Sequence, residues 1–213
     1  ICLDMVYPLA MVETTKTGEI PTSLPLYASV PLGLLLKDAE KFEIRVGLDE
    51  ELVAQLKQYS LDESDEDIQK NTSDRKRFGE GSYEEWYSKN RTPFALVKDG
   101  SLAALVWFGP KPLGRKSLKY LSEEEQKTEL EQHEDVWHTL VYRSYKPYRG
   151  AGLMSAFVRF ALDAYRELYP DAKFWVGLSD DNKASAGLAT RIGFIRRDDL
   201  FDAEKNWVAM TIE

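Results

Sequence analysis

The feature that most constrains this fold is a strand joined by a glycine-rich turn to a strongly amphipathic helix. Residues 136–142 are rich in β-branched and aromatic side chains, which favours a strand. From Gly152 onward, apolar residues recur at spacings of three and four until Pro170, which indicates a helix with one buried face. A second apolar strand follows over 174–178. A helix that connects two strands predicts a parallel crossover, and therefore an α/β chain.

The remaining elements extend this unit into a mixed sheet. Asp99-Gly100 separates two apolar runs, 94–98 and 102–108, and is typical of the turn of an antiparallel hairpin. The other expected elements are a strand over 42–48, a helix over 50–59 capped by Asp49, a helix after the Ser82/Glu85 capping box, a helix over 122–133, a helix over 183–191 and a strand over 207–212. We therefore expect an α/β (α+β) fold with one mixed, mostly antiparallel sheet flanked by helices.

The first forty-one residues differ in character from the rest. They are apolar but interrupted by prolines, which indicates short strands or extended loops. We expect 1–41 to be an N-terminal extension packed on the core and 42–213 to form one domain. The longest apolar run, 24–36, is too short and too broken to span a membrane, and the start of the chain lacks the pattern of a signal peptide.

Composition excludes several functions for the 213-residue chain. Lys and Arg number 28 and Asp and Glu 36, so the net charge is −8, which disfavours a nucleic-acid binder. Cys2 is the only cysteine, so no internal disulfide forms, which fits a reducing cytoplasm. Two histidines, His133 and His138, lie five residues apart and do not predict a metal site. The acidic run at 62–67 is either a solvated loop or a collar for a cationic substrate.

The glycine turn over 148–154 carries the clearest chemical signal. Gly150 and Gly152 allow tight backbone geometry, and the helix start presents unpaired N–H groups and the positive end of its dipole. This combination predicts an anion site suited to phosphate or pyrophosphate. A Walker loop is excluded because no Lys-Ser/Thr follows Gly152, and Ser155 excludes the third glycine of a dinucleotide fingerprint.

A second segment, 182–194, begins with Asn182 and ends with Gly193-Phe194. By itself it is a capped helix ended by a glycine. Together the two segments resemble the GNAT family of N-acetyltransferases, over roughly residues 42–213. Arg149-Gly150-Ala151-Gly152 is similar to that family's acyl-CoA loop, Arg/Gln-x-x-Gly-x-Gly/Ala. The second segment is similar to its Asn-x-x-Ala-x-x-Leu-Tyr-x-x-x-Gly-Phe helix, with Leu188, Gly193 and Phe194 in place.

Four departures from the family pattern stand out. Met154 replaces a small residue at the end of the loop motif, and Ser185 replaces the helix alanine. Many members of the family have a tyrosine at the position of Ala189, and this tyrosine is often assigned as the acid that protonates the departing CoA thiolate. The usual acid is therefore absent here. The connection between the third and fourth strands, 111–134, is long and charged.

The resemblance implies that acetyl-CoA is the co-substrate and indicates which residues would bind it. Backbone groups of Val141, Tyr142 and Arg143 would pair with the pantetheine arm, and one of their amides would polarise the thioester carbonyl. Asn182 would touch the same arm. The pyrophosphate would be held by the amides of Arg149, Gly150, Ala151, Gly152, Leu153 and Met154. The side chain of Arg149 either contacts phosphate or only packs.

We expect direct attack of an amine on the acyl carbonyl in a ternary complex. The amine must lose a proton, and His138 is either the base or a structural strand residue. Candidate acids that would replace the missing tyrosine are Ser185, Tyr142 and Tyr145. Positive charge from Arg143, Lys146 and Arg149 is expected beside the loop, and the acidic 62–67 and 123–134 segments could face the acceptor.

Three functional hypotheses follow. The first is an N-acetyltransferase that acts in the cytoplasm on a small-molecule amine or a protein amino group, without metal, nucleic acid or membrane. The second is a non-catalytic acyl-CoA sensor or degenerate family member, suggested by Ala189. The third is an interaction module in which 1–41 and 111–134 form a homodimer or partner surface.

Overall fold

The computed structural model describes residues 12–114, 122, 124 and 136–213. The helix expected over 122–133 and most of the 111–134 connection lie outside the described residues, as do Cys2 and His133. The described elements are β1 (Val12–Lys16), β2 (Ser29–Lys37), β3 (Glu40–Gly47), α1 (Glu50–Leu61), α2 (Glu66–Asn71), the π-helix η1 (Arg75–Gly79), α3 (Tyr83–Tyr87), β4 (Thr92–Lys98), β5 (Ser101–Pro110), β6 (Trp137–Ser144), α5 (Met154–Leu168), β7 (Lys173–Ser179), α6 (Lys183–Ile192), β8 (Ile195–Asp202) and β9 (Trp207–Ile212).

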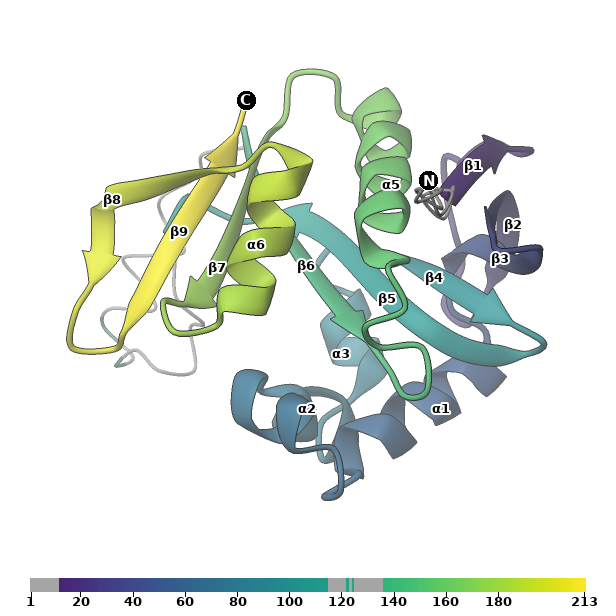
Figure 1. Cartoon of the computed structure of the whole chain (residues 1–213), viewed down its shortest axis with the longest axis horizontal. Coiled ribbons are helices and arrows are strands. Elements are labelled where there is room, and N and C mark those ends of the chain that lie inside the picture. The colour runs from purple at the N-terminus through teal and green to yellow at the C-terminus, as the bar shows by residue number, and fades with distance from the viewer. Residues whose placement is uncertain (1–11, 115–121, 123, 125–135) are drawn as a thin grey trace, which may run out of the picture.

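The strands form one sheet in the order β1-β2-β3-β4-β5-β6-β7-β9-β8 (Figure 1). Every neighbouring pair is antiparallel except β6 and β7, which run parallel because α5 connects them. The predicted mixed, mostly antiparallel sheet flanked by helices is therefore confirmed. The hairpin at Asp99-Gly100 is confirmed as well, with Lys98 opposite Ser101.

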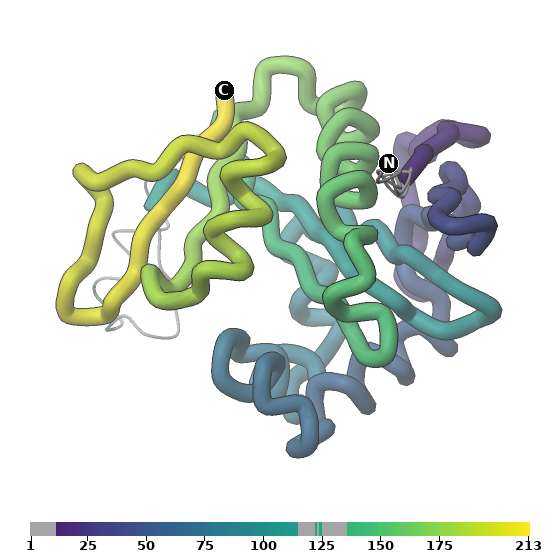
Figure 2. Tube along the Cα trace, viewed as in Figure 1, coloured from purple at the N-terminus to yellow at the C-terminus, as the bar shows by residue number. Residues whose placement is uncertain are grey.

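Helices cover both faces of the sheet and enclose two cores. Alternate residues of β5 point to opposite faces, as strand geometry requires. Val106 and Phe108 pack in the core under α5 and α6, which includes Phe157 and Leu188. Leu105 and Trp107 pack instead with α1 and α3. The tube in Figure 2 shows α5 and α6 side by side on one face, with α1 and α2 gathered below them.

The N-terminal strands belong to the same sheet. β2 and β3 form a hairpin, so the boundary predicted after residue 41 falls inside β3, and the division into two parts stays a prediction. Gly33 in β2 lies against α5: a Cβ atom there would stand 2.5 Å from the ring of Phe160. The glycine therefore permits close contact between the strand and the helix.

The structure also holds elements that the sequence pattern did not predict. β8 is an edge strand whose run Arg196-Arg197-Asp198-Asp199 lacks apolar alternation, because both of its faces are largely exposed. α2 begins inside the acidic run at 62–67 and η1 follows it; both are short, and no helix was predicted at either place. None of the helices in the described ranges has the length and apolar character needed to cross a membrane.

Candidate functional site

The two parallel strands separate from each other partway along their length. β6 pairs with β5 from His138 to Ser144, but its pairing with β7 ends at Thr139, opposite Trp175. Beyond Thr139, no strand in the described part of the chain pairs with the edge of β6 that faces β7. Both ribbon views show β6 and β7 diverging from this point, with the glycine turn at the open end (Figures 1 and 2). We call the space beside this edge the β6/β7 gap.

Hydrogen bonds at the two ends of β6 show which of its residues bond β5 and which face the gap. The Trp137 carbonyl accepts from Lys111 N at 2.9 Å, and Tyr145 N donates to the Ala103 carbonyl at 3.0 Å. In an antiparallel pair, every second residue of a strand forms main-chain hydrogen bonds with the neighbouring strand, and the residues between them point their N–H and C=O groups to the other side. The odd-numbered residues of β6 therefore bond β5, and the even-numbered ones face the gap. In the diverging stretch the even-numbered residues are Leu140, Tyr142 and Ser144.

This alternation sharpens the expectation for Val141, Tyr142 and Arg143. The amides of Val141 and Arg143 are directed to β5, so Tyr142 is the one of the three whose amide faces the gap. Its carbonyl already accepts from Arg143 Nη1 at 2.8 Å. The Ser144 carbonyl likewise accepts from Arg149, at 3.2 Å from Nε and 2.9 Å from Nη2. The gap edge therefore offers N–H donors rather than acceptors at these two residues.

The glycine turn has the backbone geometry that the sequence predicts. Gly150 and Gly152 have φ of +80° and +77°, in the left-handed region that favours glycine. The amides of Arg149 and Ala151 donate to carbonyls inside the turn, at 2.9 Å and 3.2 Å. The predicted phosphate-binding amides that have no acceptor in the described part of the chain are those of Gly150, Gly152, Leu153 and Met154.

The start of α5 differs from the other described α-helices. Its first intrahelical hydrogen bond runs from Phe157 N to the Leu153 carbonyl, so the N–H groups of the first turn precede it. The N-cap, Leu153, provides no side-chain acceptor. The other four described α-helices each have an N-cap side chain that accepts a backbone N–H: Asp49, Asp65, Ser82 and Asn182. The α5 N-terminus thus keeps free donors and a positive dipole end for an anion.

The side chain of Arg149 is engaged by protein rather than held free. Its Nη2 lies 2.6 Å from Asp65 Oδ2 and its Nη1 3.1 Å from Asp67 Oδ2. Asp65 is 5% exposed and also caps α2, and the hydrogen bond from Arg149 holds its pKa below the usual value. The prediction of a solvated loop over 62–67 is therefore wrong for Asp65, which is buried and joins α2 to the glycine turn.

A buried ion pair lies on the opposite face of β6 from α6. Asp74, 1% exposed, accepts from Arg143 Nε at 2.5 Å and Nη2 at 3.1 Å, and from Arg77 Nη1 at 2.6 Å. Burial alone would raise the pKa of Asp74, but the two guanidinium groups outweigh it and lower the pKa. Both guanidinium groups also lie over the Trp107 ring, 5.1 Å and 5.7 Å from its centroid.

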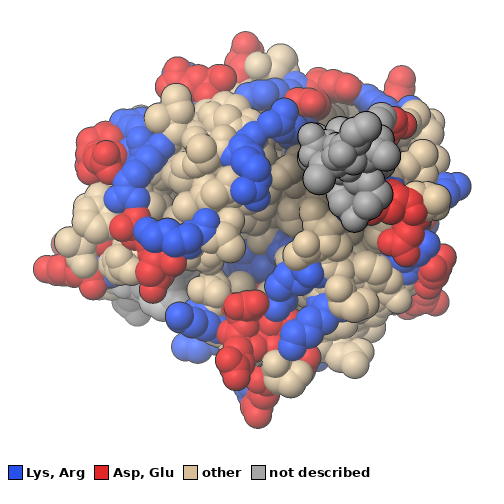
Figure 3. Space-filling model, in the orientation of Figure 1, with Lys and Arg blue, Asp and Glu red and all other residues tan. Residues whose placement is uncertain are grey.

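The predicted positive charge beside the turn is therefore largely paired. Arg143 and Arg149 bind carboxylates, and Lys146 Nζ donates to the Ser64 carbonyl at 3.1 Å. In the space-filling view, acidic side chains cluster over α2, and basic side chains border them toward the glycine turn and in the hollow above α2 (Figure 3). The pairing explains why this surface alternates in sign instead of forming one basic patch.

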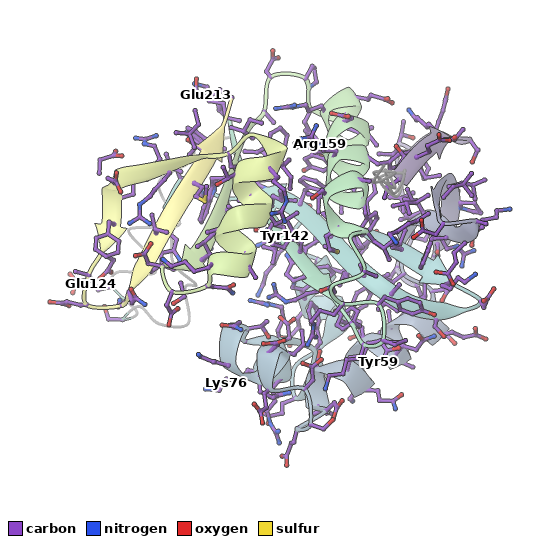
Figure 4. The ribbon with its side chains drawn as sticks, viewed as in Figure 1. Tyr59, Lys76, Glu124, Tyr142, Arg159 and Glu213 are labelled. Carbon is purple, nitrogen blue, oxygen red and sulfur yellow. The ribbon has the colours of Figure 1, made fainter. Side chains whose placement is uncertain are left out.

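Tyr142 spans the gap and meets α6. Its hydroxyl donates to the Ser185 carbonyl at 2.8 Å and lies 2.9 Å from Ser185 Oγ (Figure 4). Asn182 caps the same turn by accepting from Ser185 N at 3.0 Å, which confirms its predicted capping role. Ala189 follows Ser185 by one turn on the same helix face and is fully buried. The structure thus brings two predicted acids together beside the alanine that replaces the usual one.

His138 lies elsewhere. It is 3% exposed, and its Nδ1 is 2.8 Å from the hydroxyl of Tyr165 on α5. The ring also packs against Tyr169 and Phe174, at 4.9 Å and 6.2 Å between centroids. It sits where β6 is still paired with β7, before the gap opens. The structure therefore favours the structural alternative over a catalytic base.

Tyr145, the third candidate acid, faces away from Tyr142. It is 1% exposed and packs with α1, its ring 4.8 Å from that of Tyr59. Burial raises the pKa of its hydroxyl, which has no hydrogen-bond partner in the described structure. A cavity of about 140 Å³ between α1 and α3 is lined by Tyr27, Phe78 and Tyr83 among others and includes no residue of β6. Within the described residues, no group of three or more His, Cys, Asp or Glu side chains is arranged to hold a metal ion.

Asp65 and Asp74 are the site residues that sequence reasoning missed. Asp65 directly precedes α2, and a search for N-cap residues inside the acidic run could have found it. Asp74 gives no such signal, because its partner Arg143 is 69 residues away in sequence.

The comparisons with known proteins agree with this geometry. A sequence model described as the acetyltransferase (GNAT) family matches residues 55–194. Among curated proteins, no sequence matches the chain. Solved structures are similar in fold at low sequence identity, and three illustrate the range.

The GNAT domain of PAT from S. lividans has a TM-score of 0.60 at 13% identity, covering 89% of this chain and 99% of that one. The aminoglycoside acetyltransferase AAC(6')-Ib, solved in complex with coenzyme A, has a TM-score of 0.54 at 14% identity, covering 79% and 94%. A chimera of Vibrio cholerae spermidine N-acetyltransferase SpeG and hSSAT has a TM-score of 0.52 at 14% identity, covering 80% and 94%. The match over residues 55–194, which is most of the chain, shows that the chain belongs to the acetyltransferase (GNAT) family.

Proposed function

We propose that this protein is an N-acetyltransferase that transfers an acetyl group from acetyl-CoA to an amine of a small molecule or a protein. The observation that carries the proposal is the β6/β7 gap beside the uncapped start of α5. The gap provides an unpaired strand edge for the extended pantetheine arm of acetyl-CoA. The start of α5 provides free N–H donors for its pyrophosphate. Solved family members with coenzyme A bound support the same co-substrate here.

The backbone of this chain supplies the binding groups. In the proposal, the amides of Gly152, Leu153 and Met154 hold the pyrophosphate, and Asn182 lies beside the arm from the α6 side. The Tyr142 amide, which faces the gap, donates to the thioester carbonyl oxygen as negative charge develops there. A preorganised donor of this kind stabilises the charge without reorganisation during the reaction.

Tyr142 is the proposed acid. Burial raises the pKa of its hydroxyl, so the side chain is protonated at neutral pH, which is the form that can donate. Ser185 fixes the hydroxyl in place through two contacts. As the amine nitrogen bonds to the acyl carbon and the carbon–sulfur bond breaks, Tyr142 gives its proton to the departing thiolate. The proton lost by the amine goes to water, because His138 is buried away from the gap.

Isothermal titration with acetyl-CoA tests the binding half of the proposal. We expect saturable binding with one molecule per chain, and absence of binding by folded protein contradicts the proposal. A thiol-release assay with amino acids, peptides, polyamines and aminoglycosides tests transfer. Turnover with any amine supports an enzyme in place of a sensor.

The second candidate function is a non-catalytic acyl-CoA sensor. Ala189, fully buried on the face of α6 that carries Ser185, is the observation that favours it. Tight acetyl-CoA binding without turnover on any amine in the panel would support this candidate and contradict transfer. A cytoplasmic location and a homodimer stay predictions, to be checked by fractionation and light scattering.

A further inference from the structure

A side chain of α6, Arg191, reaches the open start of α5. Its Nε lies 3.4 Å from Oγ of Ser155, which is in the first turn of α5. A Cβ atom on Gly187, one turn earlier in α6, would stand 3.5 Å from Arg191 Nη1. The guanidinium therefore lies back along α6, toward its N-terminus, and is not placed to interact with the last carbonyls of that helix.

The same group lies at the side of the β6/β7 gap that α6 borders. Burial raises the pKa of the Tyr142 hydroxyl, and the positive charges of Arg143 and Arg191 oppose that rise, so the charge of Arg191 acts on the gap. Arg159 of α5, labelled in Figure 4, donates to the Arg191 carbonyl and joins the two helices there. Basic side chains also lie along the boundary between α5 and α6 in the space-filling view (Figure 3). Arg191 is exposed, so a ligand in solution can reach it.

Arg191 differs from the arginines nearer the glycine turn in what it contacts. Arg149 is held by Asp65 and Arg143 by Asp74, through short contacts between opposite charges. Arg191 lies instead against a hydroxyl group, at a distance longer than that of a charge-assisted hydrogen bond. Exchange of this weak contact for a phosphate group therefore costs little.

We propose that Arg191 binds the pyrophosphate of acetyl-CoA and makes the protein selective for acyl-CoA over thioesters with a single phosphodiester, such as the phosphopantetheine arm of a carrier protein. This inference rests on the proposed function, in which the amides of Gly152, Leu153 and Met154 hold the same pyrophosphate. Ser155 directly follows these amides, so a guanidinium beside its hydroxyl is next to the bound anion. A guanidinium matches phosphate oxygens in charge and in geometry, and it adds a partner for the second phosphate.

The test compares ligands that differ in their phosphates. They are CoA, dephospho-CoA, which lacks the 3′-phosphate, and the methyl ester of 4′-phosphopantetheine, which carries one phosphodiester. Binding of each to the full chain is measured by isothermal titration, with displacement of a weak ligand by acetyl-CoA. We expect Arg191→Met to weaken binding of CoA and of dephospho-CoA roughly tenfold each, and binding of the methyl ester less than about threefold.

Two further variants act as controls. Arg191→Lys keeps the charge without the planar guanidinium and should lose only part of the affinity. Arg197→Met changes the net charge by the same amount, but on β8, where its guanidinium pairs with Asp199 and β9 separates it from β7. It should bind all three ligands as wild type does. Without ligand, Arg191→Met should melt close to the wild-type temperature, because the side chain is exposed and the carbonyl contact with Arg159 is kept.

The outcomes separate the two proposals. Absence of acetyl-CoA binding by the wild-type chain contradicts the proposed function. Intact binding by wild type that is unchanged in Arg191→Met overturns only the role of Arg191. A loss for CoA without a loss for dephospho-CoA places Arg191 on the 3′-phosphate and overturns its assignment to the pyrophosphate. An equal loss for dephospho-CoA and the methyl ester overturns the selectivity.

Discussion

Two junctions connect a strand to a helix, β7 to α6 and β6 to α5. They differ in whether a side chain accepts hydrogen bonds from the first turn of the helix. At the β7–α6 junction, the Asn182 side chain accepts from Ser185 N at 3.0 Å, so the helix start is satisfied by the protein itself. At the β6–α5 junction, Leu153 offers no acceptor and two glycines with positive φ turn the backbone instead. One junction is closed by a cap, and the other stays open.

The difference teaches what each junction is for. A side-chain cap contributes about 1 kcal/mol to stability, which the α5 start forgoes. Glycine at positive φ avoids strain in the folded turn but costs conformational entropy on folding. A chain selected for stability alone has no reason to leave its longest described helix uncapped. The open junction is consistent with an anion that completes it, as the proposed function requires.

The largest expected effect comes from placing an anion in the open junction. We predict that Gly152→Asp weakens acetyl-CoA binding by roughly 100-fold or more, about 2.7 kcal/mol, because a carboxylate and a Cβ atom enter a turn with φ of +77°. The Lys37 Cε atom lies 3.7 Å from the position of that Cβ, so Lys37 is close enough to attract the new carboxylate. Isothermal titration measures the loss.

Gly100→Asp is the matched control. Gly100 has φ of +80°, open space around its Cβ position and a place in the β4–β5 turn, far from β6 in sequence. It should show the same backbone strain with unchanged acetyl-CoA affinity. Equal affinity of both variants for acetyl-CoA would contradict the assignment of the turn.

The next effect tests the link between the junctions, because Tyr142 reaches from β6 to the first turn of α6. We predict that Tyr142→Phe lowers kcat roughly 100-fold with little change in KM for acetyl-CoA, since the backbone amide is kept and the acid is lost. The raised pKa of Tyr142 means that the wild-type rate should not fall on the alkaline side below about pH 10 on its account. Steady-state kinetics across pH check both statements.

A smaller effect concerns what holds the open junction in place. Asp65→Asn removes the charge that pairs with Arg149, and we predict a loss of about 1.5–3 kcal/mol in the free energy of unfolding at pH 7. Arg149 lowers the folded-state pKa of Asp65, so this contribution is present above about pH 4 and is lost as pH falls through the lowered value. Urea denaturation at several pH values should show the two proteins converging in acid.

The smallest predicted effect is at the closed junction. Asn182→Ala should lower the free energy of unfolding by about 1 kcal/mol through loss of the α6 cap. Asn182→Asp keeps an acceptor at the same place and should retain most of the stability. If the alanine variant is as stable as wild type by denaturant titration, the two helix starts do not differ as described.

Most of the fold follows from local patterns in the sequence. The alternation in β3, the Asp-Gly turn and the periodicity of α5 each depend on neighbours a few residues away, so they predict their elements directly. β8 could not be predicted in this way, because its charged residues show no alternation and its strand form comes from pairing with β9. The α2 and η1 segments are similarly short and are shaped by what they contact.

The candidate site likewise contains residues that local sequence patterns predict and residues placed by contacts between distant segments. The two glycines and Asn182 carry local backbone signals, and the structure places them as the sequence predicts. The pairing of Asp74 with Arg143 and of Asp65 with Arg149 connects segments 69 and 84 residues apart, which no local pattern encodes. The same holds for His138, which is buried against Tyr165 of α5, 27 residues further along the chain.

Lys37 at the end of β2 has a consequence for how members of this family diverge. The family match begins at residue 55, yet the Lys37 side chain from outside that match is the nearest atom to the Gly152 Cβ position. The glycine turn, which we propose binds the pyrophosphate, is therefore bordered by a residue outside the family match. We therefore expect that a change in the length or charge of the β2–β3 turn alters the surroundings of Gly152 without any change in the glycine turn itself.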